Sequence, residues 1–519
     1  MKLLTNKITI VFLNSIIFTF AFNLPIILQR FADYKVAGGD KALYLACAEM
    51  ILSSFFVFPI IYALSGRNVI NRILLVIIYI LSAIATYFIY SINISITPEI
   101  IASFFEASKN EIVSFISIKL ILVILAASAL AYFCIFLHKV AYYDTEKNKR
   151  ITFVCVVFSL GCIFGDADFI KYIMPYNILK DSSIYILQKT SITKKRLDIS
   201  KAFQYSLEKK DEDLNIVLII GESGRADHFS LSGYKRETSP LMAKEGKNLI
   251  YFNEVTACYP LTRIAVPCMI TRGTRANRTI SGKETSFISV FKNLGFYTTW
   301  LGMQGTYTAV DAPYFELAKE SNKSLLIGTD VDMFSSNDSS LFPFIEQFYQ
   351  QHPTGNNLLV LHTYGSHFHY EDRYPDDFRK FNPICFKKEF ITDMNHCSIE
   401  ERINSYDNSI LYTDYFIKTV IDHLRDKNAL VIFTPDHGES LGEGGRFLHG
   451  TYNAAEQIAV NMMFWASDKY IKLHPDYIEN LRKYANTSIS HDHLFHSILG
   501  CGGIKSDIID NNLNLCASK

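Results

Sequence analysis

Five long apolar runs dominate the first third of the chain. Each run approaches the roughly 20 residues that an α-helix needs to cross a bilayer. Their approximate bounds are residues 8–29, 42–64, 70–91, 117–138 and 151–168. The stretch from Ile70 to Tyr90 is apolar on every face, unlike the one-sided helices that cover a soluble core. The pattern predicts a transmembrane domain of five helices over residues 1–169.

The short loops between these runs predict the orientation of the domain. Lys and Arg number eight on the side of the N-terminus and four on the other side. The first group is Lys2, Lys7, Arg67, Arg72, Lys139, Lys147, Lys149 and Arg150, and the second is Arg30, Lys35, Lys41 and Lys109. Because cytoplasmic loops carry the excess of basic residues, we expect the N-terminus in the cytoplasm. Five crossings then place everything after residue 170 outside it.

A different pattern begins at Leu214, after a polar connector over residues 170–213 that we expect to lie near the membrane surface. Short, β-branched apolar runs alternate there with amphipathic helical segments. The clearest runs are residues 215–220, 358–361, 429–433 and 460–465. Continuous apolar strands separated by helices are typical of an α/β domain whose mostly parallel sheet is buried on both faces. We expect this domain to occupy residues 214–519.

The positions of the cysteines agree with this topology. Four of the ten lie within the apolar runs, where a thiol is a small apolar side chain. The other six form three locally spaced pairs, which are Cys258/Cys268, Cys385/Cys397 and Cys501/Cys516. Such pairs suit disulfides in an oxidising compartment.

Acidic and histidine residues follow three of the predicted strands. The segments concerned are Gly221-Glu-Ser223, His362-Thr-Tyr-Gly-Ser-His367 and Thr434-Pro-Asp-His-Gly-Glu439. Ligands bind beyond the carboxyl ends of strands in such sheets, so we expect these groups to converge. Glu222, Asp436 and His437 offer oxygen and nitrogen ligands that Zn²⁺ accepts, and three ligands leave a position open for reaction. The pair Asp227-His228 has the same two residue types, and we interpret it as structural.

A candidate nucleophile lies between the first two paired cysteines. A threonine hydroxyl is barely acidic and attacks only when a base or a metal ion lowers its pKa. A disulfide between Cys258 and Cys268 would close an 11-residue loop and hold Thr262 rigidly near the ion. On spacing alone, an ordinary loop hydroxyl is the simpler interpretation of Thr262.

The segment GESGRADHFSLSGYKRETSP, from Gly221 to Pro240, resembles the signature of the membrane phosphoethanolamine transferases. These enzymes belong to the sulfatase and alkaline phosphatase superfamily and include enzymes that modify lipid A and lipopolysaccharide. The resemblance continues through the chain in the same order and with similar spacing. It includes Cys258 to Cys268 with Thr262, Leu361 to His367, Tyr406-Asp-Asn408, Thr413-Asp414, Asp436 to Glu443 and Leu448-His-Gly450.

The resemblance implies a role for each matching residue. The zinc ligands would be Glu222, Thr262, Asp436 and His437. Thr262 would also carry the phosphoethanolamine group during the reaction. His367 and His449 would line the site, where they would bind phosphate oxygens or a second zinc ion and assist proton transfer. Glu106 would contact the lipid substrate from the loop over residues 91–115.

The same resemblance implies the reaction and its location. Phosphoethanolamine would pass from phosphatidylethanolamine to a cell-envelope acceptor, which is lipid A, the lipopolysaccharide core or O-antigen. The protein would be a monomer in the inner membrane of a Gram-negative bacterium, with its catalytic domain in the periplasm. Pro98 and Ala102 stand where relatives have polar residues, and Gly305 and Thr308 stand where relatives often have Ser and Lys. These departures leave the zinc chemistry intact and the acceptor open.

Three other functions share parts of the pattern. A sulfatase requires Cys-x-Pro-x-Arg, and here Arg263 comes one position too late after Cys258. A phosphoglycerol transferase of the same superfamily would use phosphatidylglycerol and the same threonine chemistry. A non-catalytic membrane receptor or scaffold would need no complete set of zinc ligands. A nucleic-acid partner is not indicated, because 51 basic residues balance 51 acidic ones.

Overall fold

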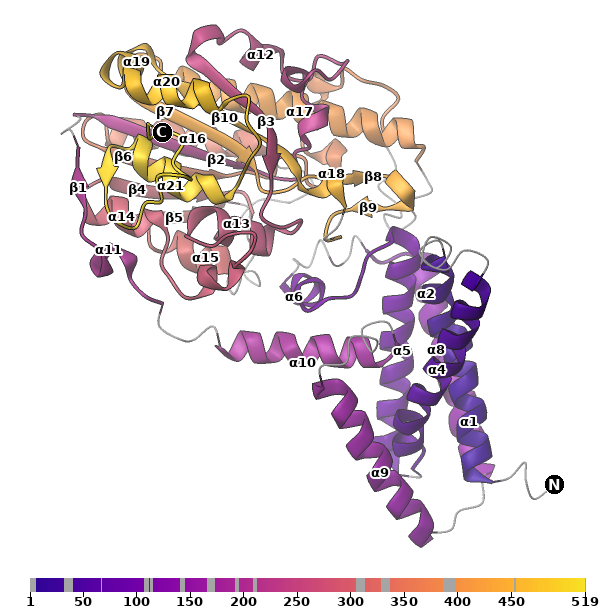
Figure 1. The fold of residues 1–519 in the computed structure, drawn as a ribbon. Coiled ribbons are helices and arrows are strands. Elements are labelled where there is room, and N and C mark those ends of the chain that lie inside the picture. Colours follow the sequence, from indigo (N-terminus) through magenta and orange to yellow (C-terminus); the bar gives the residue numbers. More distant parts are fainter. Residues whose placement is uncertain are drawn as a thin grey trace. The chain divides into compact units, whose positions relative to one another are not determined.

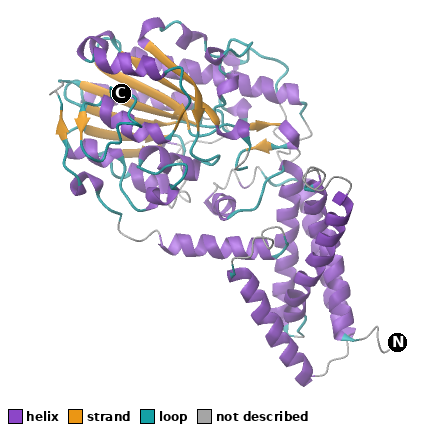
Figure 2. Cartoon of the chain, in the orientation of Figure 1, coloured by secondary structure: helices purple, strands orange, loops and turns teal. Residues whose placement is uncertain are grey.

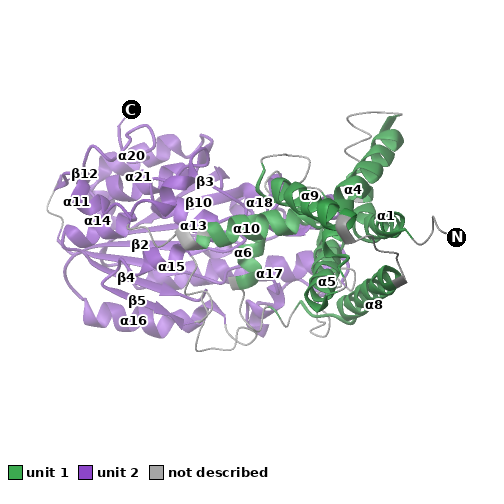
Figure 3. Cartoon of the chain, turned by 90° about the horizontal axis from the view of Figure 1, so that it is seen from below, with its two compact units in different colours: residues 1–105, 112–191, 388–394 green, residues 106–111, 192–387, 395–519 purple. Residues whose placement is uncertain are grey.

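The structure is a computed structural model with two compact units, coloured separately in Figure 3. It describes residues 6–518 except 32–40, 67, 107–111, 113–114, 141–144, 166–172, 192–195, 209–211, 305–312, 328–336, 386–396 and 452–453. The first unit comprises residues 1–105, 112–191 and 388–394, and the second comprises residues 106–111, 192–387 and 395–519.

Helices make up the first unit, and the longest of them are apolar (Figures 1 and 2). They are α1 (Lys7–Phe18), η1 (Thr19–Asn23), α2 (Leu24–Gln29), α4 (Ala42–Leu64), α5 (Val69–Ile92), α6 (Pro98–Glu106), α8 (Ile118–Val140), α9 (Thr145–Phe164) and α10 (Tyr176–Ser191). Within the described residues, four helical stretches are long and apolar enough to cross a membrane. These are Lys7–Leu28, Ala42–Leu64, Val69–Ile92 and Ile118–Lys139. They match the first four predicted spans.

The fifth predicted span corresponds to α9. The first turns of this helix carry Lys147, Lys149 and Arg150, so α9, although 20 residues long, is more polar than the other four stretches and is not counted among them. Its later turns are apolar, and Phe153 is 71% exposed, as a lipid-facing side chain would be. The predicted bounds of 151–168 extend beyond the described residues of this segment.

An eight-stranded sheet forms the centre of the second unit. Its strands are β2 (Leu214–Gly221), β3 (Leu249–Thr256), β4 (Tyr297–Gly302), β5 (Lys323–Leu326), β6 (Asn357–His362), β7 (Asn428–Pro435), β10 (Ala459–Ala466) and β11 (Ile489–Ser490). Their order is β11-β3-β10-β7-β2-β6-β4-β5, and β10 alone runs antiparallel to its neighbours in this sheet as described. Two small sheets pair β1 (Ser206–Leu207) with β12 (Ile504–Lys505) and β8 (Ser440–Leu441) with β9 (Phe447–Leu448).

Helices cover both faces of the large sheet, because its central strands are apolar on both sides. Ile216 and Leu218 of β2 belong to one hydrophobic core, and Val217 and Ile219 belong to the other. The first core includes residues of α13 (Thr262–Ile270), α14 (Phe287–Asn293), α15 (Pro313–Ala318), α20 (Pro475–Tyr484) and α21 (Asp492–Cys501). The second includes residues of α12 (Pro240–Ala243), α16 (Phe342–Gln351) and α17 (Ile399–Asp422). The predicted combination of a helical membrane domain and an α/β domain with a mostly parallel sheet is confirmed.

The segment predicted as a connector, residues 170–213, is divided between the two units. Helix α10 packs with α5 and α9 in the first unit. Leu197 instead pairs with Glu284, and β1 pairs with β12, in the second unit.

Candidate metal and nucleophile site

The carboxyl ends of three parallel strands meet at one edge of the sheet. Gly221 at the end of β2 is in register with Pro435 of β7, and Ile220 is in register with His362 of β6. The residues that follow these positions are therefore neighbours in space. This edge is where the sequence predicts the site.

Glu222 is the first residue after β2, and its side chain is 1% exposed. Ser223 Oγ donates a hydrogen bond of 2.7 Å to Glu222 Oε1, and Gln304 Nε2 donates one of 2.6 Å to Oε2. The loop after β6 comes so close that a Cβ atom on Gly365 would lie 2.7 Å from the Glu222 nitrogen. Gly365 also has a φ of 45°, which favours glycine. The carboxylate thus accepts hydrogen bonds from the adjacent Ser223 and from Gln304, and the loop at Gly365 packs against the Glu222 backbone.

Thr262 begins α13, after the loop that follows β3. Its Oγ1 donates a hydrogen bond of 2.9 Å to Glu222 Oε2 and lies 3.2 Å from His437 Nε2. The fold therefore brings the predicted nucleophile into contact with two of the predicted ligands.

Asp436 and His437 follow β7. Asp436 Oδ1 accepts the backbone N–H groups of Ser223 and His437 at 3.2 and 2.8 Å, whereas the buried Oδ2 has no hydrogen-bond partner among the described residues. His437 Nδ1 lies 2.8 Å from the Gly438 carbonyl oxygen, so Nδ1 carries the proton and Nε2 is the ligand atom. Nε2 lies 3.4 Å from Glu222 Oε1 and 3.5 Å from Asp436 Oδ2.

Two further predicted histidines lie beside this cluster. The His449 ring centroid is 4.3 Å from that of His437, and the His367 centroid is 6.0 Å from that of His449. Glu439 Oε2 lies 2.9 Å from His449 Nδ1 and orients the ring. Glu222, His437 and His449 offer ligand atoms within 4.8 Å of one another. His449, which the sequence suggests as a lining residue, is thus close enough to bind the same ion.

The shifted pKa values of Asp436, Glu222 and His437 are consistent with a cation bound between these side chains. Burial, and then the negative charge of Glu222, raise the pKa of Asp436 well above its ordinary value. Burial also opposes ionisation of Glu222, but positive charge on the imidazoles of His437, His367 and His449, present when these rings are protonated, outweighs burial and lowers the pKa of Glu222. Burial lowers the pKa of His437 to about 4, which leaves its ring neutral. Two buried carboxylates, one with an unpartnered oxygen, beside a neutral imidazole fit a divalent cation such as zinc.

Comparison with known proteins identifies the family. The sequence model of the sulfatases matches residues 214–504, and that described as phosphoethanolamine transferase EptA/EptB matches residues 54–174. The Kdo(2)-lipid A phosphoethanolamine 7''-transferase of Escherichia coli (strain K12) is 31% identical, over 93% of this chain and 91% of that protein. The chain belongs to the phosphoethanolamine transferases of the sulfatase superfamily.

Solved structures agree with this assignment. The integral membrane lipooligosaccharide phosphoethanolamine transferase A of Neisseria meningitidis has the same fold, with a TM-score of 0.80, 21% identity and 97% of both chains covered. The C-terminal periplasmic domain of EptC from Escherichia coli, solved in complex with Zn, gives a TM-score of 0.53 and 24% identity, with 60% of this chain and 89% of that chain covered. The transferase is an integral membrane protein with a periplasmic catalytic domain.

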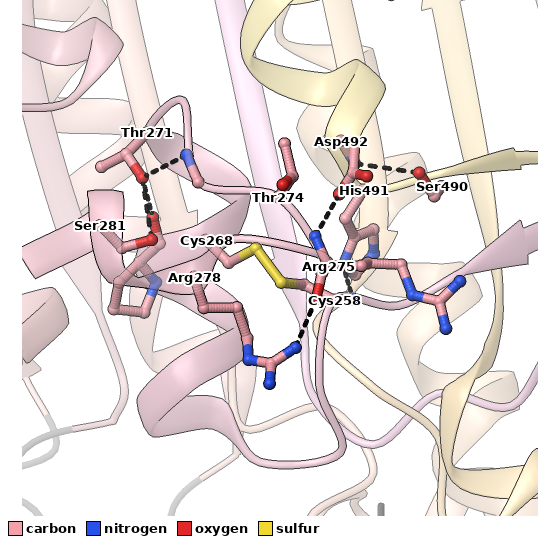
Figure 4. The surroundings of a disulfide bond; sticks show 12 residues. Cys258, Cys268, Thr271, Thr274, Arg275, Arg278, Ser281, Ser490, His491 and Asp492 are labelled. Atoms are coloured by element: carbon pink, nitrogen blue, oxygen red, sulfur yellow. Dashed lines mark hydrogen bonds between the residues drawn. A yellow bond between two sulfur atoms is a disulfide. The ribbon is translucent and has the colours of Figure 1, made fainter. Parts of the chain in front are cut away.

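Three disulfides stabilise the second unit of the transferase. They join Cys258 to Cys268, Cys385 to Cys397 and Cys501 to Cys516. The first, shown in Figure 4, connects the loop after β3 to α13. Thr262 lies between its two cysteines in the sequence. Because Cys258 is in a disulfide, it has no thiol for conversion to formylglycine, and the sulfatase alternative loses its essential residue.

Other residues singled out in the sequence have different surroundings. Asp227 pairs with Arg225, and His228 Nδ1 lies 2.6 Å from Asp407 Oδ1 inside the protein, as expected for a structural pair. Glu106 is the last residue of α6, and its side chain lies outside the described residues, as do Gly305 and Thr308.

Two residues in contact with the site were not predicted from the sequence. Gln304 donates to Glu222 from just beyond β4, and Glu439 orients His449. Glu439 stands three residues after Asp436 in the quoted motif, so its position could have indicated its role. Gln304 follows a strand that carries no acidic or histidine residue at its end, so only the parallel order of β4 and β6 reveals it.

Proposed function

We propose that this transferase moves phosphoethanolamine from phosphatidylethanolamine to a lipid A-type acceptor, with Thr262 as the carrier of the group. The strongest support is the contact of Thr262 Oγ1 with both Glu222 and His437. A half-buried hydroxyl in contact with a carboxylate and a neutral imidazole is suited to covalent catalysis, whereas hydrolysis by activated water would need no such residue.

We infer that a zinc ion is held by Glu222, Asp436, His437 and Thr262, with His449 near enough to take part. The unpartnered Asp436 Oδ2 supports this ligand set, because a buried carboxylate oxygen needs a partner. Zinc bound there would lower the pKa of the Thr262 hydroxyl and neutralise charge on the phosphoryl oxygens. Zinc bound to a related periplasmic domain, that of EptC, is consistent with this proposal.

In the first step, Thr262 Oγ1 attacks the phosphorus of phosphatidylethanolamine. The new Oγ1–P bond forms as the bond from phosphorus to the glycerol oxygen breaks, and diacylglycerol leaves. Thr262 loses its proton to solvent, from which the threonine regains a proton in the second step, and the departing glycerol oxygen takes a separate proton. His449 is placed to supply it, because Glu439 fixes Nδ1 and leaves Nε2 as the atom that gains and loses a proton.

In the second step, an acceptor oxygen attacks the same phosphorus. The bond between Thr262 Oγ1 and phosphorus breaks, the threonine regains a proton, and the acceptor carries the phosphoethanolamine. His367 and His449 lie where they can bind the phosphoryl oxygens and receive the acceptor's proton. One relative is named as a transferase that acts on Kdo(2)-lipid A, and this name supports a glycolipid of the same class as the acceptor.

The deciding experiment traps the carrier state. Purified full-length enzyme in detergent is incubated with phosphatidylethanolamine and no acceptor, and the peptide that contains Thr262 is analysed by mass spectrometry. We expect a phosphoethanolamine adduct on Thr262 and one diacylglycerol released per adduct. In a second incubation, phosphatidylethanolamine and phosphatidylglycerol are offered together. A glycerol phosphate adduct on Thr262 there would favour the phosphoglycerol transferase. Transfer to acceptor without any modification of Thr262 would contradict the two-step route.

A further inference from the structure

A buried histidine outside the ligand set lies against the loop that carries the nucleophile. His491 follows β11, the edge strand that runs parallel to β3, and its side chain is 1% exposed. Its backbone N–H donates a hydrogen bond of 3.0 Å to the Thr256 carbonyl oxygen, at the end of β3. The residue is therefore fixed to the strand from which the Thr262 loop begins.

The ring of His491 connects this loop to the strand that presents the metal ligands. Nδ1 accepts the backbone N–H of Cys258 at 3.2 Å, and Nε2 lies 3.2 Å from Thr434 Oγ1. Thr434 Oγ1 donates to the Asn461 carbonyl oxygen at 2.8 Å, so it accepts from Nε2–H. Thr434 lies in β7, two residues before Asp436. Each ring nitrogen of His491 therefore forms a hydrogen bond, one to the Thr262 loop and the other to β7.

The next residue holds the other side of the nucleophile segment. Asp492 Oδ1 accepts the backbone N–H of Arg275 at 2.9 Å, beyond the end of α13. Figure 4 shows this bond beside the Cys258–Cys268 disulfide and the ring of His491. Helix α13 is therefore tied before its start by His491 and after its end by Asp492.

We propose that His491 is a positioning residue for the transfer reaction, which fixes the Thr262 loop relative to the end of β7. A residue that only fills space here would be apolar, because a buried imidazole is unfavourable unless both nitrogens are hydrogen-bonded. The inference rests on the proposed role of Thr262, since the loop matters only if Thr262 reacts.

The experiment compares two buried histidines in the full-length enzyme. His496 on α21 is the control, because it is 6% exposed and its Nδ1 accepts a backbone N–H, that of Asp510, at 3.0 Å. Steady-state diacylglycerol release from vesicles that contain phosphatidylethanolamine and a lipid A acceptor, Tm and zinc per chain are measured for His491→Leu and His496→Leu. We expect both variants to lose Tm, and only His491→Leu to lose kcat, by about 10- to 100-fold, since small misplacements of a reacting group cost this much. KM and zinc content should change little.

Two conservative variants keep the test decisive if His491→Leu does not fold. The amide oxygen of His491→Asn lies near the Nδ1 position and can accept the Cys258 N–H, whereas His491→Gln reaches the Nε2 position instead. We expect the kcat of His491→Asn to be higher than that of His491→Gln. Equal kcat in both, or a kcat of folded His491→Leu equal to that of His496→Leu, would overturn the proposal. Thr262→Ala is assayed in parallel: if it remains active, the proposed function itself fails, whatever the His491 variants show.

Discussion

Thr262 Oγ1 lies 2.9 Å from Glu222 Oε2, although 40 residues separate the two in the sequence. Glu222 directly follows the central strand β2, and Thr262 begins α13. The parallel sheet brings these segments to one edge, and the disulfide and His491 fix the loop there. The site is therefore assembled by the fold as a whole, and each part can be tested separately.

Replacing Thr262 by alanine should abolish transfer without unfolding the protein. No other hydroxyl among the described residues is hydrogen-bonded to Glu222 while lying against His437, so we expect activity to fall by about three orders of magnitude or more. Thr262→Ser keeps a hydroxyl and should retain measurable activity. Diacylglycerol release gives the rate, and circular dichroism gives the fold. Half of the normal rate in Thr262→Ala would remove this residue from the mechanism.

Removing a ligand carboxylate should remove the metal. Glu222→Gln and Asp436→Asn each take away a buried negative charge that a cation would balance, so we expect purified protein with much less than the normal zinc per chain. Asp407→Asn is the matched control, because Asp407 is equally buried but bonds to His228 and Arg236. Elemental analysis measures zinc. Normal zinc in Asp436→Asn would show that the ligand set is wrong.

Loss of the Cys258–Cys268 disulfide should slow catalysis as well as weaken the fold. We expect Cys258→Ser/Cys268→Ser and the control Cys501→Ser/Cys516→Ser each to lower the free energy of unfolding by about 2–4 kcal/mol. Only the first pair brackets Thr262, so only it should reduce kcat at a temperature where both variants are folded. Equal kcat in the two variants would mean that the loop needs no covalent restraint.

Much of this architecture could be predicted from the chain because the signals are local. The central strands are continuous apolar runs, and in a parallel sheet the residues after them converge at one edge. Glu222, Asp436 and His437 can be singled out in this way as candidate ligands. Thr262 cannot, since a lone loop hydroxyl has no distinguishing spacing, and it is assigned only through the resemblance to a known family.

The remaining features depend on contacts between distant segments. Gln304 reaches Glu222 only because β4 lies beside β6, and His491 reaches Cys258 only because β11 adds to the sheet edge next to β3. The local pattern of apolar residues predicts strands but not their order in the sheet, so neither contact can be predicted from the sequence. Helix α9 begins at Thr145, within a charged segment, so the apolar run alone does not give the start of this helix.

A pH-dependent loss of stability should arise from Asp414, on α17, which accepts the backbone N–H groups of Leu241 and Met242 at 2.7 and 3.0 Å. Burial raises the pKa of Asp414 from 3.8 to about 7, so the folded protein holds this proton more tightly than the unfolded chain does. The resulting stabilisation is complete below about pH 4, and about 4 kcal/mol of it is lost as the pH rises to 7. Thermal unfolding in detergent should therefore show a Tm that falls more steeply over this window in the wild type than in Asp414→Asn.

Burial also raises the pKa of Glu320 to about 7, but Glu320 contributes equally to both proteins, so the difference isolates Asp414. Parallel curves would show that Asp414 is ionised in the folded protein throughout this range.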